Sequence, residues 1–122
     1  MPSALEVTAG AWLLTSIGHT VNGRDWQSHA TIKALPQEQR TCARSGWYQG
    51  SGFLFIASLL NYYWSKNPAV LQDPIQKAIA GLFSAILGVS SVFYAANGVT
   101  ANSVVTGLIS ALQAYAAFKA AN

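Results

Sequence analysis

Apolar segments alternate with polar ones along the chain and divide it into four stretches long enough to cross a membrane as helices. A helix of about 20 predominantly apolar residues spans the hydrocarbon core of a bilayer. The first two stretches are separated by a long polar connection, whereas a segment rich in Asn, Gly and Thr predicts a tight turn between the last two. We therefore expect one all-α domain without an internal repeat, a transmembrane four-helix bundle that runs up, down, up, down. The predicted spans are residues 4–21, 46–64, 75–97 and 103–118, and the polar connection is residues 22–45.

The second predicted span has aromatic residues at both ends, a pattern typical of the two membrane–water interfaces. Trp47 and Tyr48 lie at one end, and Tyr62, Tyr63 and Trp64 lie at the other. The helix that carries this span can begin well before it, because Pro36 suits a first helical turn.

The composition favours a membrane protein over a soluble helical domain, which is the alternative. Charged residues make up 9% of the chain, against about 25% in an average globular protein. No charged residue lies between Lys77 and Lys119, although a soluble amphipathic helix needs a polar face. The formal net charge of +3 is scattered and forms no arginine-rich stripe, so we expect no nucleic-acid partner.

Basic residues are concentrated in the first connection, which favours a cytoplasmic location for it. Residues 22–45 contain four of the basic residues, whereas the 97–103 turn contains none. Both termini are then expected on the opposite side of the membrane. Arg40 and Arg44 lie one helical turn apart and are placed to meet lipid phosphates.

The chain has no ionisable residue deep in its second, third or fourth span, which disfavours an ion pathway or a proton relay through the bundle. Polar residues gather instead near one interface. In an up-down bundle, the end of the first helix, the start of the second and the 97–103 turn share that face. The candidate site residues are His19, Asn22, Arg24, Asp25, Trp26, His29, Arg44, Trp47, Tyr48, Gln49, Tyr94 and Asn97.

These residue types suit acid–base catalysis on a lipophilic molecule. His19 and His29 are the candidate acid and base, since histidine exchanges protons near neutral pH. Asp25 would orient one imidazole, and Arg24 or Arg44 would stabilise a developing oxyanion. The residues expected to bind the substrate are Asn22, Trp26, Trp47, Tyr48, Gln49, Tyr94 and Asn97.

Each of these residues also has an interpretation that needs no catalysis. His19 can cap helix carbonyls at the interface, His29 can be solvated in a loop, and the arginines can meet headgroups. Two histidines ten positions apart and a single cysteine, Cys42, match no metal-ligand spacing. The chain contains no nucleotide-binding or nucleophile motif, so we expect neither a metal nor an organic cofactor.

Two short motifs give the chain a resemblance to small four-span membrane proteins of the DoxX-like and anthrone-oxygenase-like kind. The first helix ends in a Gly18-His19 step, and the second opens with the stretch Gly46-Trp47-Tyr48-Gln49-Gly50. The resemblance implies a cofactor-free enzyme that oxidises, cyclises or isomerises a polyketide or terpenoid intermediate of a natural-product pathway. The chain is shorter than most such proteins.

Two classes of function remain. The first is a small integral membrane enzyme that acts on a lipophilic metabolite by cofactor-independent acid–base chemistry. The alternative is a non-catalytic scaffold or subunit that binds lipid, a partner helix or a second copy of the chain. Such a scaffold would use faces of small residues, which let helices approach closely in lipid. These faces occur at Gly46 and Gly50, at Ala80, Ser84 and Gly88, and at Gly107 and Ala111. The clustering of complementary polar groups favours the enzyme.

Overall fold

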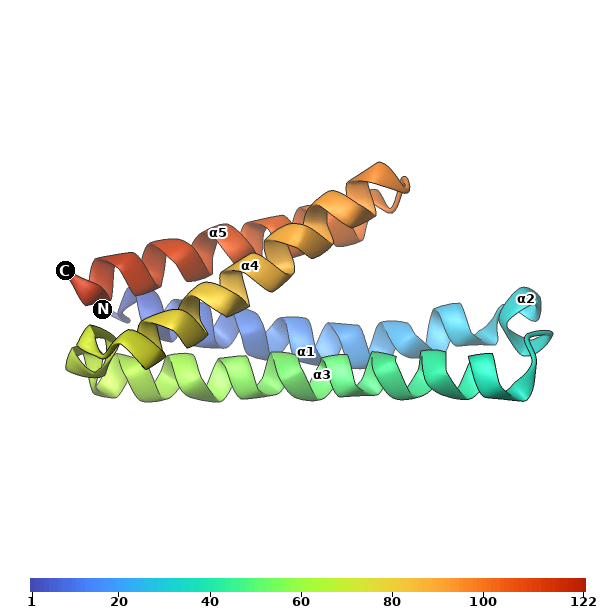
Figure 1. Ribbon diagram of the computed structural model, residues 1–122, viewed down its shortest axis with the longest axis horizontal. Coiled ribbons are helices and arrows are strands. Elements are labelled where there is room, and N and C mark those ends of the chain that lie inside the picture. The colour runs from blue at the N-terminus through green and yellow to red at the C-terminus, as the bar shows by residue number, and fades with distance from the viewer.

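The computed structural model describes residues 1–122 and is helical along almost its whole length (Figure 1). It confirms the all-α prediction, since it contains five α-helices, one 3-10 helix and no strand. The elements are α1 (Ala4–Ser28), α2 (Ala30–Lys33), α3 (Gln37–Lys66), η1 (Pro68–Gln72), α4 (Pro74–Ala96) and α5 (Thr100–Ala121).

The polar connection expected at residues 22–45 is mostly helical. α1 continues past Val21 to Ser28, because no proline interrupts it. α3 begins at Gln37, directly after Pro36, as the sequence predicts. The non-helical part of the connection is therefore confined to a few residues on either side of the short helix α2.

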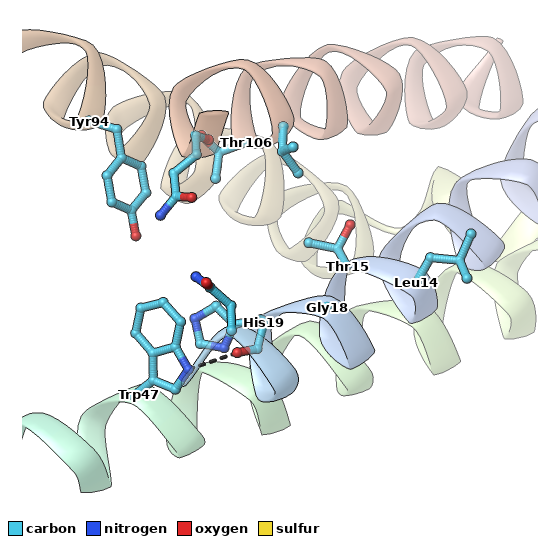
Figure 2. A pocket seen from close by; sticks show the side chains of 10 residues that line it. Leu14, Thr15, Gly18, His19, Trp47, Tyr94 and Thr106 are labelled. Atoms are coloured by element: carbon cyan, nitrogen blue, oxygen red, sulfur yellow. Dashed lines mark hydrogen bonds between the residues drawn. The ribbon is translucent and has the colours of Figure 1, made fainter. Parts of the chain in front are cut away.

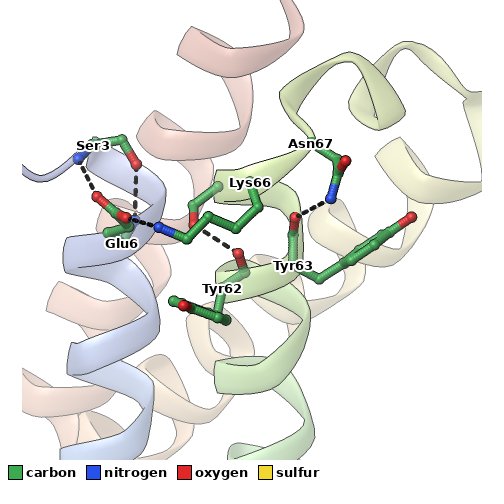
Figure 3. A network of polar contacts seen from close by, with 7 residues as sticks. Ser3, Glu6, Tyr62, Tyr63, Lys66 and Asn67 are labelled. Atoms are coloured by element: carbon green, nitrogen blue, oxygen red, sulfur yellow. Dashed lines mark hydrogen bonds and ion pairs between the residues drawn. The ribbon is translucent and has the colours of Figure 1, made fainter.

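Local side-chain signals fix the start of α1. Ser3 and Glu6 form a capping box, in which the Ser3 hydroxyl accepts from the Glu6 amide and the Ser3 amide donates to the Glu6 carboxylate. Glu6 also pairs with Lys66, which ties the start of α1 to the end of α3 (Figure 3). The hydrogen bond to Glu6 raises the pKa of Lys66 above its ordinary value.

The predicted turn between the last two helices is present at residues 97–99. The Val99 amide donates to the Tyr94 carbonyl at 2.9 Å and the Gly98 amide donates to the Ala95 carbonyl at 3.2 Å, which together form a Schellman motif. Gly98 has a φ of +74°, a conformation that costs glycine little because it has no Cβ. α5 then begins at Thr100, slightly before the predicted Ser103.

The four long helices form two antiparallel hairpins, α1 with α3 and α4 with α5 (Figure 1). The hairpins meet at the end that holds both termini and η1, and they diverge toward the turn between α4 and α5. The molecule is therefore open at one end, in place of the closed bundle that the sequence suggests.

α1 and α3 pack along a seam in which small and polar residues alternate with leucine and tryptophan. The seam positions advance in alternating steps of three and four residues, as in a coiled coil. Two serine hydroxyls bond to backbone carbonyls across it, Ser58 to Ala9 at 2.8 Å and Ser16 to Ser51 at 2.9 Å. The seam consists of Leu5, Ala9, Trp12, Ser16, His19 and Gly23 in α1, and of Trp47, Ser51, Leu54, Ser58 and Asn61 in α3.

α4 and α5 carry two copies of the same short motif, S-x3-G-x2-S. The motif consists of Ser84, Gly88 and Ser91 in α4 and of Ser103, Gly107 and Ser110 in α5. Because the helices are antiparallel, the first serine of each copy faces the last serine of the other. The two copies are thus related by a local pseudo-twofold axis.

Reciprocal hydrogen bonds and close glycine contacts hold this repeat together. Ser84 and Ser110 each donate to the other's carbonyl, at 2.9 and 2.7 Å, and Ser91 and Ser103 do the same at 2.7 and 2.9 Å. A Cβ on Gly107 would lie 2.8 Å from the Ser91 hydroxyl. The small residues that could have formed a face for a partner helix therefore pack largely within the chain.

One cluster of aromatic and amide side chains joins the two hairpins. Phe83 of α4 lies against Trp12 and Trp64, with ring centroids 5.7 and 6.1 Å apart. Gln113 of α5 is fully buried, and its Oε1 accepts hydrogen bonds from Trp12 Nε1 and Asn61 Nδ2, each at 2.7 Å. These three residues come from three helices, so the Gln113 amide fixes both hairpins at this end.

Outside this cluster, most apolar side chains are exposed, since only 19 of 122 residues are buried. α4 and α5 are each long and apolar enough to cross a membrane, and only 17% and 11% of their most apolar stretches are buried within the chain. α1 and α3 do not meet that measure. Polar seam residues such as Ser16 and Ser58 lower their mean hydropathy, although these helices expose Ile17, Phe55 and Leu59.

Candidate functional site

A cleft of about 370 Å³ lies between the two hairpins where they diverge (Figure 2). All four long helices contribute to it. Its lining is mixed, with apolar side chains beside an imidazole, two amides, a phenol and two threonines. The lining residues are Leu14, Thr15, Gly18, His19 and Asn22 from α1, Trp47 from α3, Tyr94 from α4, and Asn102, Val105 and Thr106 from α5.

The imidazole of His19 is held in one orientation by α3. Its ring stacks on the indole of Trp47, with centroids 3.8 Å apart and planes 9° from parallel. His19 Nδ1 lies 2.9 Å from the Ser51 hydroxyl, and Trp47 Nε1 donates to the His19 carbonyl at 2.8 Å. His19 Nε2 makes no hydrogen bond within the protein. Because a hydroxyl can donate or accept, either neutral tautomer satisfies the Ser51 contact and leaves Nε2 free to accept or to donate.

Two glycines give this arrangement the space it needs. A Cβ on Gly23 would lie 2.6 Å from Trp47 Nε1, and a Cβ on Gly50 would lie 3.1 Å from the His19 ring. Both distances are shorter than ordinary van der Waals contacts. Gly50 therefore serves a contact within the chain, whereas a Cβ on Gly46 would meet no atom within 4 Å.

Three polar side chains of the cleft make no hydrogen bond to the rest of the protein. They are the amides of Asn22 and Asn102 and the hydroxyl of Tyr94, and they come from three different helices. Figure 2 shows Tyr94 reaching from α4 across the cleft toward Trp47 and His19 on the other hairpin. The cleft thus gathers several donors and acceptors that are free to bind a polar group.

The structure brings four of the predicted site residues together in the cleft, namely His19, Asn22, Trp47 and Tyr94. Trp26 does not line the cleft but packs against Trp47 in an edge-to-face arrangement, with ring centroids 5.3 Å apart.

The other predicted residues do not line the cleft. Asp25 is exposed and makes no ion pair, and His29 is the exposed residue that ends α1. Tyr48 accepts a 3.4 Å hydrogen bond from Gln27, Gln49 donates to Ser45, and Asn97 caps α4. Arg24 and Arg44 line a separate groove.

The two histidines are kept apart by the continuation of α1. Ten residues separate His19 from His29, which corresponds to about 15 Å along a helix at 1.5 Å per residue. The expected acid–base pair of His19 with His29, oriented by Asp25, is therefore not assembled. No group of three His, Cys, Asp or Glu side chains lies close enough to hold a metal ion.

Some residues that line the cleft, or that support its lining, were not predicted from the sequence. Ser51 and Gly23 lie opposite His19 and Trp47 because α1 and α3 pair in one particular register. The seven-residue spacing of Ser51 and Ser58, matched by Ala9 and Ser16 in α1, is a signal in the sequence that agrees with this register but does not fix it. Thr15 and Thr106 carry no comparable signal.

Comparisons with known proteins add no relative. No protein-family model, curated protein or solved structure matches the chain. The resemblance to DoxX-like proteins stays a prediction that rests on the two short motifs.

Proposed function

We propose that the chain is an integral membrane protein that binds a lipophilic small molecule with a polar group in the cleft between its hairpins. The observation that carries this proposal is the cleft's set of unpaired polar groups, His19 Nε2, Asn22, Tyr94 and Asn102, beside apolar side chains. A polar group that is shielded from water by lipid is costly unless a partner satisfies it. A ligand with one polar end and an apolar body would do so.

The membrane location is supported by the exposed apolar surface. α4 and α5 lie mostly outside the protein core, unlike the central helices of a soluble protein, and they are not at the N-terminus as a signal sequence would be. α1 and α3 bury Ser16, Ser51 and Ser58 between them, and they leave large apolar side chains exposed, among them Ile17, Ile56 and Leu59. We propose that all four long helices span the membrane on this basis.

We further propose that His19 exchanges a proton with the bound molecule. Its Nε2 is free and its ring is fixed, so the imidazole can remove a proton from the ligand at one position and return it at another. Such a step is an isomerisation, which conserves all atoms and electrons and needs no cofactor. The Tyr94 hydroxyl is the group on the opposite hairpin that would donate a hydrogen bond to the developing oxyanion. It takes the role first assigned to Arg24 or Arg44.

The scaffold alternative is less well supported. Gly50, Gly88 and Gly107, which were to supply faces for a partner helix, pack against His19, Ser110 and Ser91 of the same chain.

The test compares His19→Ala with His29→Ala. The proteins are purified from membranes in mild detergent, and co-purifying molecules are quantified by mass spectrometry. We expect the parent and His29→Ala to retain the same lipophilic molecule, and His19→Ala to retain about tenfold less, the equivalent of about 1.4 kcal/mol of lost hydrogen bonding. Equal retention by His19→Ala, or loss in His29→Ala alone, would contradict binding in this cleft.

A second readout tests proton exchange itself. The loaded protein is incubated in D2O and the bound molecule is examined for deuterium on carbon. Incorporation by the parent and by His29→Ala, but not by a His19→Gln protein that still retains the molecule, is the expected result. No incorporation by the parent would leave a binding protein and rule out the enzyme.

A further inference from the structure

A second groove, of about 370 Å³, lies at the connecting end of the α1/α3 hairpin. The end of α1, the short helix α2 and the start of α3 form it. It is lined by four of the seven basic residues of the chain, together with Gln27, Ser28 and Ile32. The basic residues are Arg24, Lys33, Arg40 and Arg44.

No carboxylate neutralises these four charges. The chain has four acidic residues, and its one ion pair joins Glu6 to Lys66 at the other end of the molecule. Asp25 and Glu38 lie close in sequence to the groove but pair with none of its basic residues. Four positively charged side chains that lie close together repel one another. An anion bound among them would reduce this repulsion.

The arginines of the groove are available to such an anion. The guanidinium groups of Arg24 and Arg44 make no hydrogen bond within the protein. Arg40 donates to the Lys33 carbonyl at 2.9 Å, which holds α2 against α3 and closes one side of the groove. A guanidinium presents two parallel N–H groups that match the oxygens of a phosphate.

The groove lies where lipid phosphates would lie, if the chain spans the membrane as proposed above. Arg24 follows the first predicted span, which ends at residue 21, and Arg44 precedes the second, which begins at residue 46. Trp26, Trp47 and Tyr48 occupy the same level, as aromatic residues do at the membrane interface. Basic residues at this level attract anionic lipids of the cytoplasmic leaflet.

We infer that the groove formed by Arg24, Lys33, Arg40 and Arg44 binds the phosphate of an anionic phospholipid headgroup. A headgroup with net negative charge, such as phosphatidylglycerol, fits four unpaired cations. A zwitterionic headgroup brings its own ammonium group and fits them less well. This site is separate from the cleft, because the two share no lining residue.

The experiment uses native mass spectrometry of the 122-residue chain in detergent, titrated with phosphatidylglycerol or phosphatidylcholine. The variant Arg24→Gln/Arg44→Gln removes two charges without removing a hydrogen bond within the protein. The control is Lys77→Gln/Lys119→Gln, which removes two charges outside the groove, near the start of α4 and near the end of α5. Each basic residue near an anionic lipid raises the affinity for that lipid about fivefold. The groove variant lacks two of them, so it should bind phosphatidylglycerol about 25-fold more weakly than the parent does. The control should bind it as the parent does.

Three results would overturn the inference. The first is equal binding of phosphatidylglycerol and phosphatidylcholine by the parent. The second is a loss of phosphatidylglycerol binding in the control that equals the loss in the groove variant. The third is that inorganic phosphate at millimolar concentration binds to the lipid-free protein and displaces the lipid. Retention of the protein in carbonate-washed membranes is measured in parallel. A protein that is retained but shows no lipid selection contradicts only the groove, whereas a protein that is not retained contradicts the membrane location and the groove together.

Discussion

At the scale of single residues, the position of His19 depends on what α3 places opposite it. Trp47 supplies the stacking surface, Ser51 the partner of Nδ1, and Gly50 the room for the ring. That His19, Asn22, Trp47 and Tyr94 gather at one place was predictable, because each is polar or aromatic near the end of an apolar stretch. Ser51 was not, because its importance comes only from the register of two helices.

Gly23→Ala tests whether the Trp47 indole holds this arrangement. A Cβ at residue 23 would lie 2.6 Å from Trp47 Nε1, so the indole must move and its 2.8 Å hydrogen bond to the His19 carbonyl is lost. We expect a shift in tryptophan emission and reduced retention of the cleft ligand. Gly10→Ala is the matched control on the same helix, since a Cβ there meets nothing within 4 Å. If both variants behave like the parent, the indole does not hold His19 as described.

At the scale of helices, the boundaries that rest on local chemistry were predictable and the pairings were not. Pro36 and the residues of the 97–99 turn mark helix ends in the sequence, and the structure places ends there. The extension of α1 to Ser28 was not predicted, because the end at residue 21 was placed where the apolar stretch stops. A helix can continue beyond its apolar stretch. The repeat in α4 and α5 was missed because serine and glycine are common in apolar helices and stand out only when the two copies face each other.

Gly107→Leu tests the paired motif of α4 and α5. The added side chain would meet the Ser91 hydroxyl and separate it from the Ser103 carbonyl, to which it donates at 2.7 Å. Overpacking of this kind costs about 1–3 kcal/mol, which should appear as a lower free energy of unfolding by SDS in mixed micelles. Gly81→Leu on α4 is the control, because a Cβ at residue 81 meets nothing within 4 Å. Equal stability of the two variants would show that the motif does not hold the hairpin.

At the scale of the whole molecule, the two hairpins share one small core and leave most of their apolar surface uncovered. The core lies at the end with both termini, where Phe83 and Gln113 of the second hairpin meet Trp12 of the first. The far ends diverge and enclose the cleft. The all-helical class and the grouping of helix ends followed from the sequence. The opening between the hairpins did not, because it depends on where the few large side chains pack.

The membrane location is the central claim, because the proposals of a lipophilic ligand in the cleft and of a lipid phosphate in the groove both depend on it. The most direct measurement is labelling of single cysteines with a water-soluble maleimide that is supplied to both sides of intact membranes. Cys42, the one natural cysteine, is exposed and lies outside the proposed spans. Val89 is 72% exposed on the outer surface of α4, so Val89→Cys in a Cys42→Ser background reports whether that surface faces water or lipid. We predict that Cys42 reacts and that Val89→Cys reacts only after detergent is added. Equally rapid reaction of both cysteines in intact membranes would contradict the membrane location.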